Sequence, residues 1–177
     1  MKTIIISYSF TGNNETLSKS LATALDAEHI RISESKRRTM STIFLDLLLN
    51  RTPEVDFVPE KIQDDDLVIF VGPVWVGSIA TPLRACFKQL SNRKGPYLFV
   101  SISGGSGGGN PKLGSELTKR MGKGPLALID MHIADLLQQE ANPQRKDTAA
   151  YRLTANDIKK LTENVVDTLH RIQRPQI

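Results

Sequence analysis

Short apolar runs alternate with longer amphipathic segments along the chain. Runs rich in Ile, Val and Leu lie at residues 2–8, 28–32, 66–72, 97–103 and 126–133 and are typical of strands. Segments with apolar residues at helical spacing lie at residues 17–25, 42–49, 81–90, 110–121 and 154–172. Because strands that are joined by helices and apolar on both faces form parallel sheets covered by helices, we expect an α/β fold.

The order of these elements predicts the architecture more closely. Five strands in strict alternation with five helices most often form a doubly wound five-stranded parallel sheet of order 2-1-3-4-5, in three layers, α/β/α. The chain has 177 residues, which suits one compact domain, and we expect that domain to span residues 1–177.

Local signals mark where three of the helices begin. Thr-Pro at residues 81–82 and Asn-Pro at residues 110–111 each fit an N-cap followed by the first helical position. Thr154 and Asp157 have the spacing of a capping box ahead of the last helix. We therefore expect helices to start at these three points.

Three polar loops follow the first, third and fourth predicted strands, at residues 9–14, 73–80 and 101–110. In an open parallel sheet, ligands bind outside the carboxyl ends of the strands, at the switch point between the first and third. The three loops are therefore expected to converge on one rim of the sheet and to form the binding site.

The first of these loops has the chemistry of an anion site. It supplies hydroxyls, amides, a glycine for close backbone approach and the N–H groups at the start of a helix, which together suit a phosphate. Its candidate residues are Ser9, Thr11, Gly12, Asn13 and Asn14. The alternative is an N-cap and turn without a ligand, because the same residue types are favoured there in any case.

Composition narrows the classes of function. The net charge is only +4, and the basic residues cluster weakly, so we expect no nucleic-acid binding. No run of about 18 apolar residues occurs, so we expect no membrane span. The single cysteine, Cys86, allows no intrachain disulfide, which indicates a cytoplasmic protein, and we interpret it as a core residue. The three histidines are too scattered to predict a metal site, and no G-x-x-x-x-G-K-[ST] motif occurs.

The three rim loops resemble those of the flavodoxin family. The segment SFTGNNETLSKSLA, residues 9–22, is similar to that family's phosphate loop, S/T-x-T-G-x-T, with Asn14 where threonine is usual. The segment GPVWVGSIATPLRACF, residues 72–87, resembles the place where such chains set an aromatic residue beside the flavin. The segment SISGGSGGGN, residues 101–110, stands where the other flavin-contacting loop should be.

This resemblance implies a flavodoxin-like fold with FMN as the cofactor. The five residues of the first loop would then hold the 5′-phosphate, and Trp75 would pack against the isoalloxazine. Backbone groups of the glycine-rich loop would face the polar edge of the ring. Beyond the first loop, the implied cofactor-binding residues are Pro73, Val74, Trp75, Val76, Gly77, Ser103, Gly104, Gly105, Ser106, Gly107 and Gly109.

Two departures from the family bear on function. The first departure is that the rim loops contain no Asp or Glu. A carboxylate about 5 Å from a reduced, anionic flavin would repel it by roughly 3 kcal/mol at an effective dielectric near 20, and these loops lack that repulsion. The second departure is that the third loop has no aromatic residue to cover the second flavin face. That face is then either open to a small-molecule donor or acceptor, or covered by a second copy of the chain in a homodimer.

Three functions stay open at this point. The first is an FMN-dependent oxidoreductase that reduces quinone-like acceptors from NAD(P)H, with the flavin carrying the hydride and no catalytic acid or base required of the protein. The second is a flavodoxin-type electron carrier that docks on redox protein partners. The third is a flavin-free binding or regulatory domain.

Overall fold

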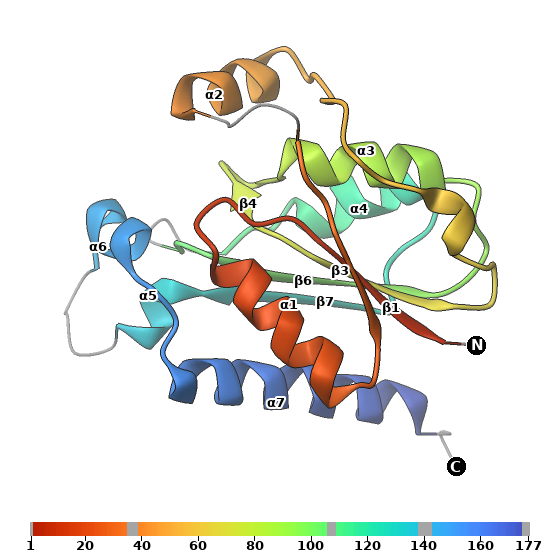
Figure 1. Ribbon diagram of the computed structural model, residues 1–177. Coiled ribbons are helices and arrows are strands. Elements are labelled where there is room, and N and C mark those ends of the chain that lie inside the picture. Colours follow the sequence, from red (N-terminus) through yellow and green to blue (C-terminus); the bar gives the residue numbers. More distant parts are fainter. Residues whose placement is uncertain (1, 35–38, 106–108, 138–142, 175–177) are drawn as a thin grey trace.

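The sheet has five parallel strands in the order β2-β1-β3-β6-β7. The computed structural model describes residues 2–34, 39–105, 109–137 and 143–174 (Figure 1). The strands are β1 (Thr3–Ser7), β2 (Glu28–Arg31), β3 (Leu67–Val71), β6 (Tyr97–Ser103) and β7 (Ala127–His132). Counted along the chain, this is the order 2-1-3-4-5, so the predicted fold class is confirmed.

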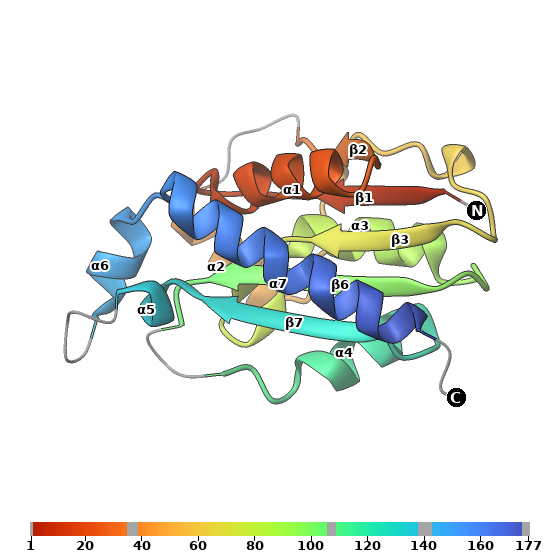
Figure 2. The same ribbon diagram turned by 90° about the horizontal axis from the view of Figure 1, so that it is seen from below.

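Helices cover both faces of the sheet, as Figures 1 and 2 show. On one face, α1 (Asn13–Ala24) and α7 (Ala155–Gln173) lie side by side, and on the other face lie α3 (Thr81–Leu90) and α4 (Leu113–Met121). The short helices α5 (Ile133–Leu136) and α6 (Arg145–Ala150) lie beyond the carboxyl ends of the strands. The apolar helix α2 (Met40–Leu48) contacts α3.

The strand residues divide strictly between two cores. In β1, Ile4 and Ile6 face α3 and α4, whereas Ile5 faces α1 and α7, as the two-residue period of a strand requires. Cys86 is fully buried in the core between the sheet and the helices α3 and α4, and burial raises the pKa of its thiol to about 12. This confirms its interpretation as a core residue.

Of the three predicted helix starts, one is confirmed, one is displaced by one residue and one is wrong. At α7 the capping box is present: the Asp157 backbone N–H donates to Thr154 Oγ1 at 3.2 Å, and the Thr154 backbone N–H donates to Asp157 Oδ2 at 2.8 Å. Helix α3 begins one residue early, at Thr81, with Ala80 as its cap. The predicted start of α4 was wrong, because Asn110 does not cap the helix and instead donates to Asp130 Oδ2 at 2.8 Å.

Several short elements have no counterpart in the sequence patterns. They are the hairpin strands β4 (Val74–Trp75) and β5 (Ser78–Ile79), the 3₁₀ turn η1 (Pro59–Lys61), and the helices α5 and α6. Each is six residues or fewer, which is too short to establish a hydrophobic period.

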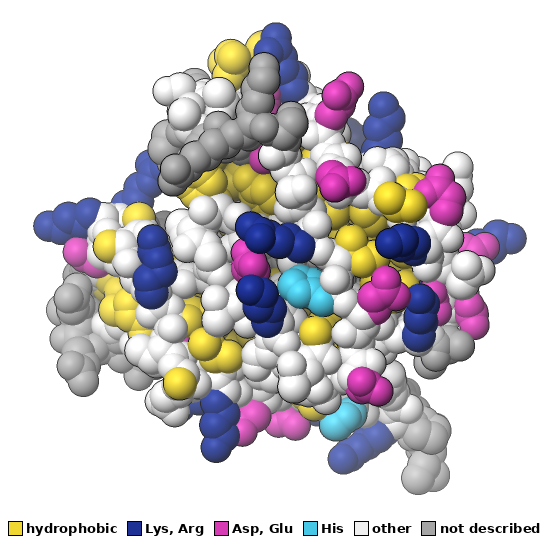
Figure 3. Space-filling view, in the orientation of Figure 1, with side chains coloured by type: hydrophobic (Ala, Val, Ile, Leu, Met, Phe, Trp, Pro, Cys, Tyr) yellow, Lys and Arg dark blue, Asp and Glu magenta, His cyan; other side chains and the backbone are white. Residues whose placement is uncertain are grey.

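The surface of the α1 and β2 side carries charges of both signs (Figure 3). Glu15 accepts from Lys19 at 3.0 Å and from Arg31 at 3.3 Å on this face. Within the described ranges, none of the helices combines the length and the hydrophobicity that crossing a membrane requires.

Candidate functional site

A pocket of about 600 Å³ opens at the carboxyl ends of β1, β3 and β6. This is the switch point of the sheet, because β2 lies on one side of β1 and β3 lies on the other. All three predicted loops contribute to its wall. From the described residues of these loops, the predicted residues that line it are Thr11, Asn14, Pro73, Val74, Trp75, Val76, Gly77, Ser103, Gly104, Gly105 and Gly109. Two further predicted residues, Ser106 and Gly107, lie outside the described residues.

Ser9 and Gly12 shape the first loop and do not line the pocket. The Gly12 backbone N–H donates to Ser9 Oγ at 3.0 Å, which closes the loop on itself. Gly12 is in the left-handed conformation, with φ 98°, and its carbonyl accepts the first backbone hydrogen bond of α1, from Thr16 N–H. Together they fix the point where the chain turns into α1.

The side chain of Asn13 is buried and turned away from the pocket. Its Nδ2 donates to the Tyr151 carbonyl at 3.0 Å, and its Oδ1 accepts from the Leu153 N–H at 3.2 Å. Asn13 therefore fastens the start of α1 to the link between α6 and α7, and only its backbone is left to face a ligand.

Asn14 fastens the same loop to the sheet. Its Nδ2 donates to the Ile102 carbonyl at 2.9 Å, and its Oδ1 accepts from the Ile102 N–H at 3.1 Å. The pairing of β3 with β6 has already ended at Val71 and Val100, so the Asn14 amide continues the hydrogen bonding of β6 beyond the end of β3. The asparagine that departs from the family motif thus serves the backbone of a neighbouring strand.

Trp75 is half-buried in the wall of the pocket. It lies edge-on between two aromatic rings, with centroid distances of 5.8 Å to Tyr8 and 6.1 Å to Phe10. Edge-to-face packing of this kind fixes the orientation of an aromatic ring. The indole therefore has a defined position on the β4–β5 hairpin.

The tip of that hairpin is a two-residue turn in which both residues have positive φ, 50° at Val76 and 74° at Gly77. Glycine adopts this conformation freely, but a β-branched residue does so at a cost of about 1–2 kcal/mol. Val76 is also 89% exposed. The structure therefore holds an apolar side chain in a strained conformation at the mouth of the pocket.

Glycine is required in the third loop where its backbone packs against β7. Gly105 has φ 73°, and a Cβ at that position would lie 2.3 Å from the His132 Cβ. A Cβ on Gly104 would meet Thr148 Oγ1 at 3.0 Å. The loop is therefore held close to β7 and α6, with its backbone along the pocket.

Sequence reasoning missed several pocket residues. Phe10 adds an aromatic wall, Ile43 and Ile133 add apolar contacts, and α6 contributes Arg145 and Thr148. Among the described lining residues, Arg145 is the one with a charged side chain. Phe10, and the further lining residues Ile102 and Asn110, lay within loops that the sequence pointed to, whereas no pattern marked α6 as part of the rim.

No protein-family model matches the sequence, and a search of the curated proteins finds no significant match. Solved structures do match. A flavoprotein from Lactobacillus acidophilus NCFM, crystallised in complex with FMN, is 22% identical, with a TM-score of 0.58 over 78% of this chain and 97% of that one. A Bacteroides eggerthii protein assigned as a flavoprotein is 13% identical, with a TM-score of 0.64 over 95% of this chain and 98% of that one. A flavodoxin from the domain Archaea is 12% identical, with a TM-score of 0.54 over 98% of this chain and 100% of that one.

The fold is flavodoxin-like. The Bacteroides eggerthii protein and the archaeal flavodoxin align with 95% and 98% of this chain. At such low identity the likeness establishes the flavodoxin-like fold alone.

Proposed function

We propose that this flavodoxin-like chain binds FMN in the rim pocket and works as a redox flavoprotein. The observation that carries the proposal is one pocket that joins an aromatic wall, a glycine-rich backbone and the N-terminus of α1. A flat aromatic ring with a phosphate tail needs these three features together. The flavoprotein from Lactobacillus acidophilus, which has this fold, was crystallised with FMN and supports the same assignment.

The residues divide between the two ends of the cofactor. Thr11 and the first backbone N–H groups of α1 would hold the phosphate, which the helix dipole favours by about 0.3–1 kcal/mol. Trp75 would pack against the ring, and the backbone of Ser103, Gly104 and Gly105 would face its polar edge. When bound, FMN supplies the electron and hydride chemistry that these side chains lack.

We infer that the protein is an oxidoreductase that takes electrons from NAD(P)H and passes them to a quinone-like acceptor. Of the lining residues that the structure describes, none is an Asp or Glu, and Arg145 is positively charged. Reduction adds negative charge to the ring. A pocket without carboxylates and with one arginine lowers the cost of adding that charge and so favours two-electron transfer.

Stoichiometric reduction distinguishes this enzyme from an electron carrier. We expect the FMN-loaded protein to be reduced fully by one equivalent of NADPH or NADH and to oxidise the nucleotide continuously when a benzoquinone is present. Photoreduction of the same sample is the control that the flavin can accept electrons. Photoreduction that pauses after one electron, with no nucleotide oxidation, would contradict the enzyme and favour a carrier.

A further inference from the structure

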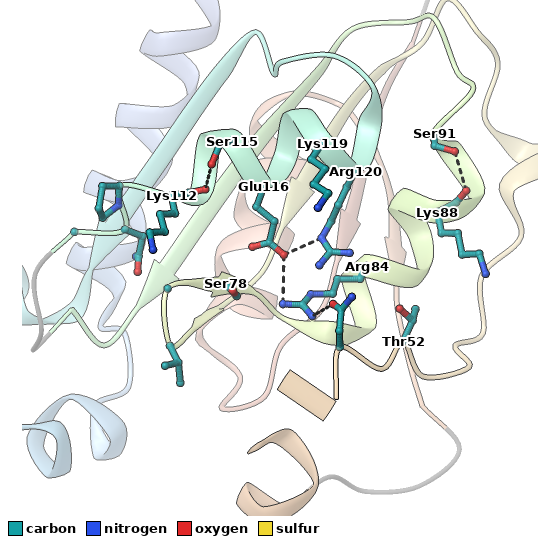
Figure 4. Close-up of a pocket in the computed structure, with 16 residues that line it drawn as sticks. Thr52, Ser78, Arg84, Lys88, Ser91, Lys112, Ser115, Glu116, Lys119 and Arg120 are labelled. Carbon is teal, nitrogen blue, oxygen red and sulfur yellow. Dashed lines mark hydrogen bonds and ion pairs between the residues drawn. The ribbon is translucent and has the colours of Figure 1, made fainter. Parts of the chain in front are cut away.

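A second and larger hollow of about 900 Å³ lies between α3, α4 and the tip of the β4–β5 hairpin. Figure 4 shows its residues, with Arg84 and Lys88 on α3 and Lys119 and Arg120 on α4. We call this hollow the basic groove. Its volume is within the range of about 300–1,000 Å³ that small-molecule sites occupy.

The charge of the groove is strongly positive. Five cationic side chains line it against one carboxylate, giving a formal charge of 5 − 1 = +4. The cationic residues are Arg84, Lys88, Lys112, Lys119 and Arg120, and the carboxylate belongs to Glu116. Four net positive charges in one hollow favour a ligand with several negative charges.

The two arginines share a carboxylate partner, and among the described residues the three lysines have none. Glu116 Oε1 accepts from Arg120 Nε at 2.8 Å and pairs with Arg84 Nη2 at 3.3 Å. Across the described ranges, no carboxylate forms an ion pair with Lys88, Lys112 or Lys119, and all three are exposed. Their ammonium groups are therefore available to a ligand.

The floor of the groove is rigid. Arg84 is only 4% exposed, its Nε donates to the Ile79 carbonyl at 3.0 Å, and its Nη1 donates to Asn50 Oδ1 at 3.2 Å. Burial lowers the pKa of the Arg84 guanidinium, and the charge of Arg120 lowers it further, while Glu116 raises it. An arginine stays charged under such shifts, so a fixed positive charge lies beneath the lysines.

The basic groove is continuous with the rim pocket. Val76 and Gly77 at the hairpin tip, with Gly109 and Asn110 after the glycine-rich loop, line both. A ligand anchored by anionic groups in the groove can therefore reach across these four residues into the pocket.

We propose that the basic groove binds the adenosine phosphate end of NAD(P)H, so that the nicotinamide end reaches the rim pocket. This rests on the function proposed above and adds the place where the donor is held. Lys88, Lys112 and Lys119 bind the phosphates as point charges, and the hydroxyl of Ser78 can donate a hydrogen bond to them. A concave hollow of this size fits a small polyanion better than the face of an acidic protein.

The test replaces the three lysines together and measures binding of adenosine 2′,5′-bisphosphate and of ADP by calorimetry. We expect the K88Q/K112Q/K119Q variant to bind both probes roughly 10- to 100-fold more weakly than the unmodified protein. The KM for the dinucleotide rises by a similar factor, while kcat and FMN affinity stay unchanged. The control variant K61Q/K94Q/K159Q loses the same charge at exposed lysines that do not line the groove.

Equal probe affinity in the two triple variants, or no binding of either probe at low salt, overturns the proposal. The latter is the result expected if the groove instead receives an acidic redox protein. The probes are titrated into the flavin-free chain as well as the FMN-loaded one, so the two proposals fail separately. Absence of FMN binding counts against the proposed function, whereas FMN binding and dinucleotide turnover without sensitivity to the three lysines count against the groove alone.

Discussion

We expect the Glu116→Ala variant to lose roughly 3–5 kcal/mol of its free energy of unfolding. Arg84 is 4% exposed, and in this variant it would keep its charge beside Arg120 without the carboxylate between them. Removing one partner of a buried pair leaves the other charge uncompensated, which costs more than the pair itself contributes. Chemical denaturation of the variant and the unmodified protein measures the difference.

The same substitution should disturb the rim pocket. Glu116 Oε2 accepts from the Ile79 N–H at 3.0 Å, and Arg84 Nε donates to the Ile79 carbonyl at 3.0 Å. Together they hold the end of the hairpin that carries Trp75. Because Trp75 is the only tryptophan of the sequence, its native-state emission should shift in the variant.

Glu163→Ala is the matched control, since Glu163 is an exposed glutamate in a helix. Its effect on stability should stay within about 0.5 kcal/mol. If Glu116→Ala unfolds at the same denaturant concentration as Glu163→Ala, the Arg84–Glu116–Arg120 network does not stabilise the fold.

Asn14→Leu should cost roughly 2–4 kcal/mol. Leucine has a similar volume but cannot bond the Ile102 N–H and carbonyl, and a buried backbone group without a partner costs about 1–3 kcal/mol. The variant should also bind FMN more weakly, because the loop that enters α1 loses its attachment to β6. Thermal unfolding with and without FMN measures both effects.

Asn156→Leu makes the same change at an exposed position of α7 and should be nearly neutral. If Asn14→Leu is as stable as Asn156→Leu, the amide of Asn14 does not replace a strand partner for Ile102.

The sheet was predictable because its three inner strands, β1, β3 and β6, are short apolar runs that helices bury on both faces. In β1, three consecutive isoleucines divide between two cores, and only a strand between two helical layers uses them all. The meeting of the three loops followed from the parallel arrangement, which places the carboxyl ends of neighbouring strands at one edge.

The hairpin and α6 could not be predicted in this way. Strands β4 and β5 have two residues each, and the turn between them places a valine where asparagine or glycine would be the usual signal. Arg145 and Thr148 reach the pocket from a six-residue helix more than 130 positions after the first loop. No local pattern carries that information.

The two asparagines show a different limit of the sequence. The sequence shows that two amides lie beside a helix start, which suits a phosphate. It does not show the distant backbone groups that form hydrogen bonds with these amides. Those partners, Tyr151 and Leu153 for Asn13 and Ile102 for Asn14, lie 88 or more positions away. That the loop holds a phosphate through its backbone stays a prediction.

Titration of the purified protein with FMN, followed by tryptophan emission and by the visible absorbance of the flavin, tests the central claim most directly. Since Trp75 is the sole tryptophan and lines the pocket, its emission reports on this site alone. We expect emission to fall and to saturate at one FMN per chain, with a shifted flavin spectrum. Unchanged emission and a free-flavin spectrum at micromolar FMN would contradict a flavin site in this pocket.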